Sequence, residues 1–219
     1  MTFFDLDERG RGLDRALAFS DGVFAIAITL LVLAFRVPNL HGDNLNHRLL
    51  DALLKQGSLL VGFSVSFFVI ARLWMSHHRL SLLLRQVDTR FMALNVVFLA
   101  FVVFLPFPAE IVGLYGQTTV GVVFYAATMC VTLIISAAVW TYAFRHQLVD
   151  PRAGPDALRQ AWLRAGFPVV VFAISIPVAF LVATNAELVW ILLVAQHWVL
   201  PHIGGRDATP VPSTPSPRG

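Results

Sequence analysis

Six long apolar segments most restrict what this chain of 219 residues can fold into. A helix needs roughly 20 residues to cross about 30 Å of hydrocarbon, and each segment is close to that length. They cover residues 15–36, 54–76, 89–112, 119–144, 158–183 and 186–203. Hydrophobic residues make up 57% of the chain, charged residues only 13%, and the mean hydropathy is +0.73. The sequence therefore predicts an all-α integral membrane protein with six transmembrane helices in residues 1–203.

The basic residues predict the orientation of these helices. Thirteen of the sixteen Lys and Arg residues fall in the N-terminal arm, the even-numbered connections and the tail, and three fall on the opposite side. Because basic loops stay in the cytoplasm, we expect a multi-pass protein of the cell membrane with both termini cytoplasmic. The larger set is Arg9, Arg11, Arg15, Arg72, Arg79, Arg85, Arg90, Arg145, Arg152, Arg159, Arg164, Arg206 and Arg218, and the smaller set is Arg36, Arg48 and Lys55.

Three segments outside the predicted spans have their own patterns. Leucines recur at helical spacing from Leu49, which predicts a short interfacial helix before the second span. Pro106 and Pro108 are expected to end the third helix, so that residues 106–119 form an outer connection. Residues 204–219 are rich in Pro, Ser, Thr and Gly and predict a disordered tail.

The first span holds one carboxylate, Asp21, in an otherwise apolar run. An ionisable group at mid-membrane costs about 2.5 to 3.5 kcal/mol on insertion scales. Asp21 should therefore have a buried partner or contact water. Ser20 precedes it and Arg15 lies at the entrance of the helix, so the group is either a hydrogen-bond anchor between helices or part of an ion pathway.

The same helix carries a stripe of branched side chains. Ile26, Leu30 and Leu33 are spaced i, i+4 and i+7, and Thr29 lies beside them. On an arbitrary apolar helix such a stripe faces lipid or packs against a neighbour. If several copies of the helix met at an axis, the stripe would instead form a hydrophobic constriction.

Candidate partners for Asp21 lie at the end of the second span. Trp74, His77 and His78 occur there, and because adjacent residues point in different directions, His77 is expected to bond near Ser20 and Asp21 while His78 faces water or headgroups.

Other polar or small residues in the spans indicate helix packing. Asn95 in the third span is expected to bond between helices. Ser58, Gly62 and Ser66 repeat every four residues, as in closely packed membrane helices.

Several classes of chemistry lack support in the sequence. There is no Gly-x-Ser-x-Gly elbow, no P-loop and no pair of intramembrane carboxylates, so we predict no catalytic residues and no enzyme. No third ligand accompanies the two histidines at zinc-like spacing, so no metal site is predicted. Cys130 is the single cysteine. The basic residues alternate with apolar spans, which argues against nucleic-acid binding.

Several motifs in the first half of the chain occur together and in order. They are R-x-x-x-F-S-D at Arg15, Phe19, Ser20 and Asp21; W-x-x-H-H at Trp74, His77 and His78; Asn95; and the LPFP segment at Leu105–Pro108. This set resembles the signature of the lysosomal TMEM-type potassium channel family, and especially of its bacterial members. The second half of the chain carries no motif that we can map onto that family.

The resemblance implies a homotetramer of six-helix subunits around a central pore lined by the first helix, with other copies of the chain, the lipid bilayer and potassium ions as partners and with no cofactor. The family lacks the TVGYG filter, as does this sequence. In that family the narrow point lies five residues after the motif aspartate, and the resemblance implies Ile26 as that position here. The resemblance further implies Leu30 and Leu33 as pore layers, and Thr29 as a polar contributor.

The motif residues would then hold the first helix in place. By resemblance, Arg15, Phe19, Ser20 and Asp21 tie it to its neighbours, with Trp74 and His77 as partners. The function implied is a potassium-selective, leak-like cation channel. From the residues alone, a proton-coupled secondary transporter using Asp21 and His77 is equally open, although no pair of interrupted spans of the transporter kind is evident.

Overall fold

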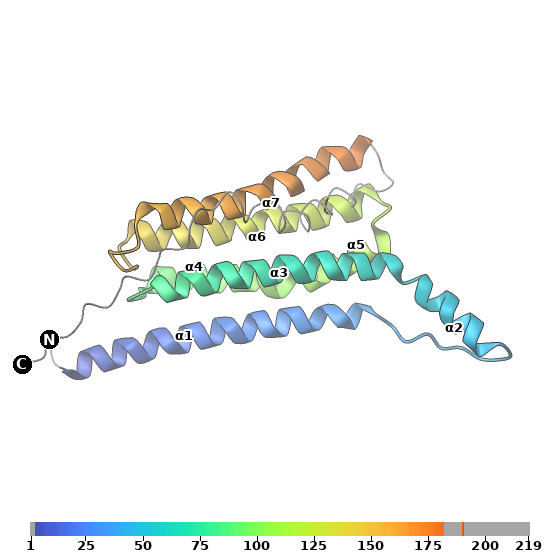
Figure 1. Cartoon of the computed structure of the whole chain (residues 1–219), viewed down its shortest axis with the longest axis horizontal. Coiled ribbons are helices and arrows are strands. Elements are labelled where there is room, and N and C mark those ends of the chain that lie inside the picture. Colours follow the sequence, from blue (N-terminus) through green and yellow to red (C-terminus); the bar gives the residue numbers. More distant parts are fainter. Residues whose placement is uncertain (1–2, 182–189, 191–219) are drawn as a thin grey trace, which may run out of the picture.

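Long helices run alongside one another in the computed structural model, which describes residues 3–181 and Trp190 (Figure 1). The elements are α1 (Phe3–Leu30), the 3-10 turn η1 (Leu31–Ala34), α2 (Leu45–Leu54), α3 (Gly57–Leu83), α4 (Thr89–Phe104), α5 (Pro106–Tyr115), α6 (Thr119–Arg145) and α7 (Pro155–Leu181). α1 packs against α3 and α4, while α7 packs against α6 at the opposite edge.

Five helical segments of the described residues are long and apolar enough to cross a membrane. They are Gly12–Ala34, Gly57–Leu83, Thr89–Tyr115, Thr119–Arg145 and Asp156–Leu181. These segments match the first five predicted spans, and the all-α membrane class is confirmed. The sixth predicted span, 186–203, lies outside the described residues except for Trp190, and the predicted tail, 204–219, lies entirely outside them.

The second span continues beyond the end that the sequence predicts. α3 extends to Leu83 instead of stopping near residue 76. Leu73, His77 and Leu80 are all buried on one stripe of this extension. Because the apolar stripe continues to find packing partners, the helix continues with it.

The third span changes helix at a proline instead of ending there. α4 stops at Phe104, and Pro106 occupies the first turn of α5. A proline is tolerated in a first helical turn because its missing N–H has no partner to lose there. The expected outer connection, 106–119, is therefore wrong over most of its length, since α5 reaches Tyr115 and only a short turn precedes α6.

A short helix precedes the second span, as the leucine spacing predicts. α2 begins at Leu45, one turn before the predicted start at Leu49, and follows Asn44 in the left-handed region at φ 59°. None of its residues is buried. Its placement at a membrane interface stays a prediction.

Two glycines bring α3 and α5 into close contact. A Cβ on Gly62 would lie 3.2 Å from the backbone oxygen of Ala109, and a Cβ on Gly113 would lie 2.7 Å from Leu59 Cδ2. Only glycine leaves room for the two backbones at this distance. The packing role predicted for the face containing Gly62 is confirmed.

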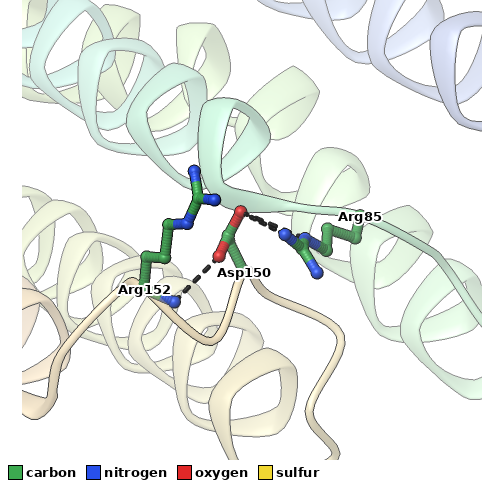
Figure 2. A network of polar contacts seen from close by, with 3 residues as sticks. All are labelled: Arg85, Asp150 and Arg152. Atoms are coloured by element: carbon green, nitrogen blue, oxygen red, sulfur yellow. Dashed lines mark hydrogen bonds and ion pairs between the residues drawn. The ribbon is translucent and has the colours of Figure 1, made fainter. Parts of the chain in front are cut away.

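An ion pair joins the two connections at one end of the bundle (Figure 2). Arg85 donates to Asp150 Oδ2 at 2.7 Å through Nη2 and at 3.1 Å through Nε. The Arg152 backbone N–H donates to Asp150 Oδ1 at 2.8 Å. This backbone bond, together with Arg85, holds the pKa of Asp150 below its usual range. An isolated antiparallel bridge between Leu84 and Val149 lies beside the pair.

Candidate functional site

Helix α1 has one face buried in the bundle and one face directed away from it. The buried stripe consists of small or apolar residues and one serine: Ala16, Ser20, Phe24, Ala27 and Leu31. These positions meet α3 and α4, the helices against which α1 packs. The opposite stripe has no cover from the described part of the chain.

The three branched residues singled out in the sequence lie on this uncovered stripe. Ile26 is 58% exposed, Leu30 37% and Leu33 69%. Thr29 is also exposed, and its hydroxyl donates to the Ile26 backbone oxygen at 2.9 Å. In a membrane these side chains must face either lipid or other copies of the chain.

Asp21 has a hydrogen-bond partner on α3. Trp74 Nε1 donates to Asp21 Oδ1 at 2.9 Å, and the Trp74 ring stacks on His78 with centroids 5.5 Å apart. Asp21 is exposed within one subunit, which leaves its carboxylate open to water there. Among the described side chains, no hydrogen bond or ion pair joins Arg15 or Phe19, both exposed, to this group.

Ser20 and Asn95 form a second link, buried between α1 and α4. Ser20 Oγ donates to the Ala16 backbone oxygen at 2.9 Å and accepts from Asn95 Nδ2 at 3.0 Å. Both side chains are buried. Asn95 Oδ1 has no partner in the described structure. The amide therefore bonds between helices.

His77 does not reach Ser20 or Asp21 by a hydrogen bond, contrary to the sequence-based expectation. It is buried, and its ring centroid lies 5.7 Å from those of Phe24 and Phe98. Its Nε2 has no partner among the described residues. The physical reason is the rotation of α3, which buries His77 against Phe24 and Phe98 and directs Trp74 to Asp21.

No cluster of three or more His, Cys, Asp or Glu side chains in the described part of the chain could hold a metal ion. The candidate site is therefore a helix surface with a polar anchor behind it. Bonds to Ser20 and Asp21 hold α1 against α3 and α4. The exposed stripe with Ile26, Leu30 and Leu33 has no cover from the described part of the chain.

Comparison with known proteins assigns the chain to a family. The family described as endosomal/lysosomal potassium channel TMEM175 matches residues 15–106, the segment from the middle of α1 to the end of α4. A relative from Streptomyces collinus, named a potassium channel, is 32% identical over 204 residues, covering 91% of this chain and 94% of the relative. The chain belongs to the TMEM175 potassium channel family.

Other members of the TMEM175 family agree with this assignment. A relative from Chamaesiphon minutus, also named a potassium channel, is 34% identical over 169 residues, covering 74% of this chain and 83% of the relative. The crystal structure of a lysosomal potassium-selective channel TMEM175 homolog from Chamaesiphon minutus matches with a TM-score of 0.64 and 31% identity, covering 83% of this chain and 97% of that one. TMEM175 is a family of ion channels and not of enzymes.

The second half of this TMEM175 chain contains a polar contact that sequence reasoning missed. Tyr125 of α6 is buried, and its hydroxyl bonds to Ser66 of α3 at 2.9 Å. Its ring packs against Phe172, with centroids 5.9 Å apart, and against Trp190 at 4.6 Å. A tyrosine in the middle of an apolar span was the available signal, since a buried hydroxyl needs a partner.

Proposed function

We propose that this protein is a potassium channel assembled from four copies of the chain, with α1 of each copy facing a central pore. One observation carries the proposal. Helix α1 lies at one edge of the subunit and α7 at the opposite edge (Figure 1), and the stripe of α1 with Ile26, Leu30 and Leu33 is exposed. Four such stripes around an axis cover one another and leave a narrow apolar passage.

Ile26 is proposed as the constriction, with Leu30 and Leu33 as further layers. Hydrophobic rings can gate a pore by losing their water, so a small change in radius switches conduction. The Thr29 hydroxyl donates its hydrogen to the Ile26 backbone oxygen. The lone pairs of the hydroxyl oxygen therefore remain available to a passing cation. The permeant potassium ion is the only small species that this arrangement requires.

Ser20 and Asp21 are proposed to set the rotation of α1. Asn95 holds Ser20 from α4, and Trp74 holds Asp21 from α3. Two anchors on adjacent residues, pulled by different helices, resist rotation of α1 about its axis. Arg15 and Phe19 belong to the same motif, and both are exposed in the single subunit, where a neighbouring copy would meet them.

The membrane orientation is proposed from the distribution of basic residues. Both termini then lie in the cytoplasm, and the N-terminal end of α1 forms the cytoplasmic mouth of the pore. The proton-coupled transporter alternative gains nothing from the geometry. Its two groups, Asp21 and His77, bond to or pack against different partners and share no hydrogen bond among the described residues.

The test is a reversal potential under a gradient with potassium on one side and sodium on the other, measured on protein reconstituted in liposomes or planar bilayers. A potassium channel shifts the reversal potential toward the potassium equilibrium value. Ile26→Asn should change conductance and selectivity, because a polar ring stays wet. Ile134→Asn on α6 is the matched control, since Ile134 is 55% exposed and lies away from α1. Equal behaviour of the two variants would remove Ile26 from the pore.

A further inference from the structure

Two arginines of α3 lie within a membrane-spanning helix. The sequence assigns Arg72 and Arg79 to the connection after the second span, but α3 includes both and ends at Leu83. At 1.5 Å per residue, Arg72 lies about 16 Å before that end. Arg72 is half-buried and Arg79 is exposed. A guanidinium at this depth is costly unless it reaches the interface or finds an anion.

Both arginines lie on the side of α3 that faces α6. Ser76 follows Arg72 by one turn and precedes Arg79 by one turn, so the three residues share a stripe. Ser76 Oγ accepts a hydrogen bond from Trp140 Nε1 of α6 at 3.2 Å. Trp74, on a different face of α3, turns toward α1 instead. The arginines therefore lie away from the helix that is proposed to line the pore.

No counter-charge within the described residues neutralises these two arginines. Neither guanidinium has a hydrogen bond or ion pair there, and Arg72 is close enough to Arg79 to feel its charge. The acidic groups in the connections at this end already have partners, since Asp150 is paired with Arg85 (Figure 2) and Asp88 accepts from the Phe91 N–H and the Tyr142 hydroxyl. Two neighbouring like charges favour an anion that can contact both.

An apolar wall accompanies the pair. The Phe144 ring of α6 is half-buried, and it stacks on the buried Trp140 ring with centroids 6.0 Å apart and planes at 15°. Indole and phenyl rings near a membrane surface commonly contact acyl chains and headgroups. The two cations of α3 therefore lie near a partly exposed phenyl ring of α6, a combination that suits a lipid with an anionic headgroup.

We propose that an anionic phospholipid binds here, with its phosphodiester between Arg72 and Arg79 and an acyl chain along Phe144. The lipid would come from the leaflet on the N-terminal side of the bundle. Guanidinium groups bind phosphate oxygens in pairs, and long arginine side chains extend along a helix toward headgroups. A soluble phosphate would have to enter the hydrocarbon layer to reach Arg72. The proposal needs the membrane fold but not ion conduction.

The test is native mass spectrometry of the full-length protein after reconstitution with phosphatidylglycerol and phosphatidylcholine. Wild-type protein should retain phosphatidylglycerol preferentially. The double variant Arg72→Gln, Arg79→Gln should retain it roughly 10- to 100-fold more weakly, with phosphatidylcholine unchanged. The matched control Arg90→Gln, Arg159→Gln removes two exposed arginines elsewhere on the bundle and should behave as wild type.

Three outcomes would overturn the proposal. Equal losses in the test and control variants would indicate general charge attraction. Release of bound phosphatidylglycerol by excess inorganic phosphate would indicate a soluble anion. Loss of the oligomer with unchanged lipid retention would place these arginines against a neighbouring copy. If the glutamine variant does not fold, the double variant Arg72→Lys, Arg79→Lys takes its place. It keeps both charges and should still weaken the retention of phosphatidylglycerol several-fold, because lysine lacks the paired donors of arginine. Unchanged retention in the lysine variant would refute the proposed contact.

Discussion

Trp74 Nε1 donates to Asp21 Oδ1 at 2.9 Å, so that a residue of α3 holds the motif carboxylate of α1. A second bond, from Asn95 Nδ2 to Ser20 Oγ at 3.0 Å, holds the preceding residue from α4. Together they orient the stripe that we assign to the pore. Predictions about conduction therefore separate into changes at the stripe and changes at its anchors.

Replacing Trp74 by Phe should loosen α1 while keeping an aromatic ring in place. The variant removes one hydrogen bond to a carboxylate, which is worth about 1 kcal/mol at an exposed position. We expect a lower melting temperature of the oligomer and altered conductance. The control Trp162→Phe removes an indole bond of 3.2 Å to Thr141 between α6 and α7 and should leave conductance unchanged. Equal effects on conductance would contradict an anchoring role specific to α1.

Asn95 should tolerate loss of polarity better than gain of charge. Asn95→Leu removes the bond to Ser20 but also removes an unpartnered buried oxygen, so we expect a stability change within about 1 kcal/mol. Asn95→Asp places a carboxylate beside Ser20 with no cation bonded to it, and should cost several kcal/mol. Chemical denaturation in detergent measures both. A leucine variant less stable than the aspartate variant would refute this account of the site.

Gly113→Ala should separate α3 from α5. The added Cβ would lie 2.7 Å from Leu59 Cδ2 and 3.1 Å from Leu59 Cα, and the second contact is with backbone that cannot move freely. We expect a loss of about 1 to 3 kcal/mol in unfolding free energy. Gly166→Ala on α7, where a Cβ meets nothing within 4 Å, should be neutral or slightly stabilising. Thermal unfolding of both variants in one detergent makes the comparison.

The ion pair between Arg85 and Asp150, which joins the two connections, should weaken in acid. The Arg152 N–H and Arg85 hold the pKa of Asp150 below its usual range in the folded state. Their contribution is therefore fully present above the unfolded pKa of about 3.9 and is lost as the pH falls through the folded value. Relative to the intrinsic exchange rate of the amides at each pH, the protection of residues 148–152 from hydrogen exchange should fall in strong acid in the wild type. In Asp150→Asn this protection should already be lower at neutral pH and should change less in acid, while Asp43→Asn should follow the wild type.

Composition and segment length were sufficient to predict an all-α membrane protein. A run of about 20 apolar residues has one stable conformation in hydrocarbon, so each described span appears where the sequence predicts one. Boundaries were less secure, because they depend on packing. α3 continues to Leu83 along a buried stripe, and Pro106 starts a helix instead of ending one, since a first helical turn accepts it.

By itself the sequence determined the five described spans, the family motif and the polar residues available to anchor α1. Only the tertiary structure decided which face of α1 is covered, because Phe24 and Leu31 are as apolar as Ile26 and Leu33, and an all-apolar helix shows no preferred side. It also decided that Asp21 bonds to Trp74 while His77 lies between phenylalanines. Those pairings depend on the rotation of three helices against one another, which close packing sets and local sequence does not.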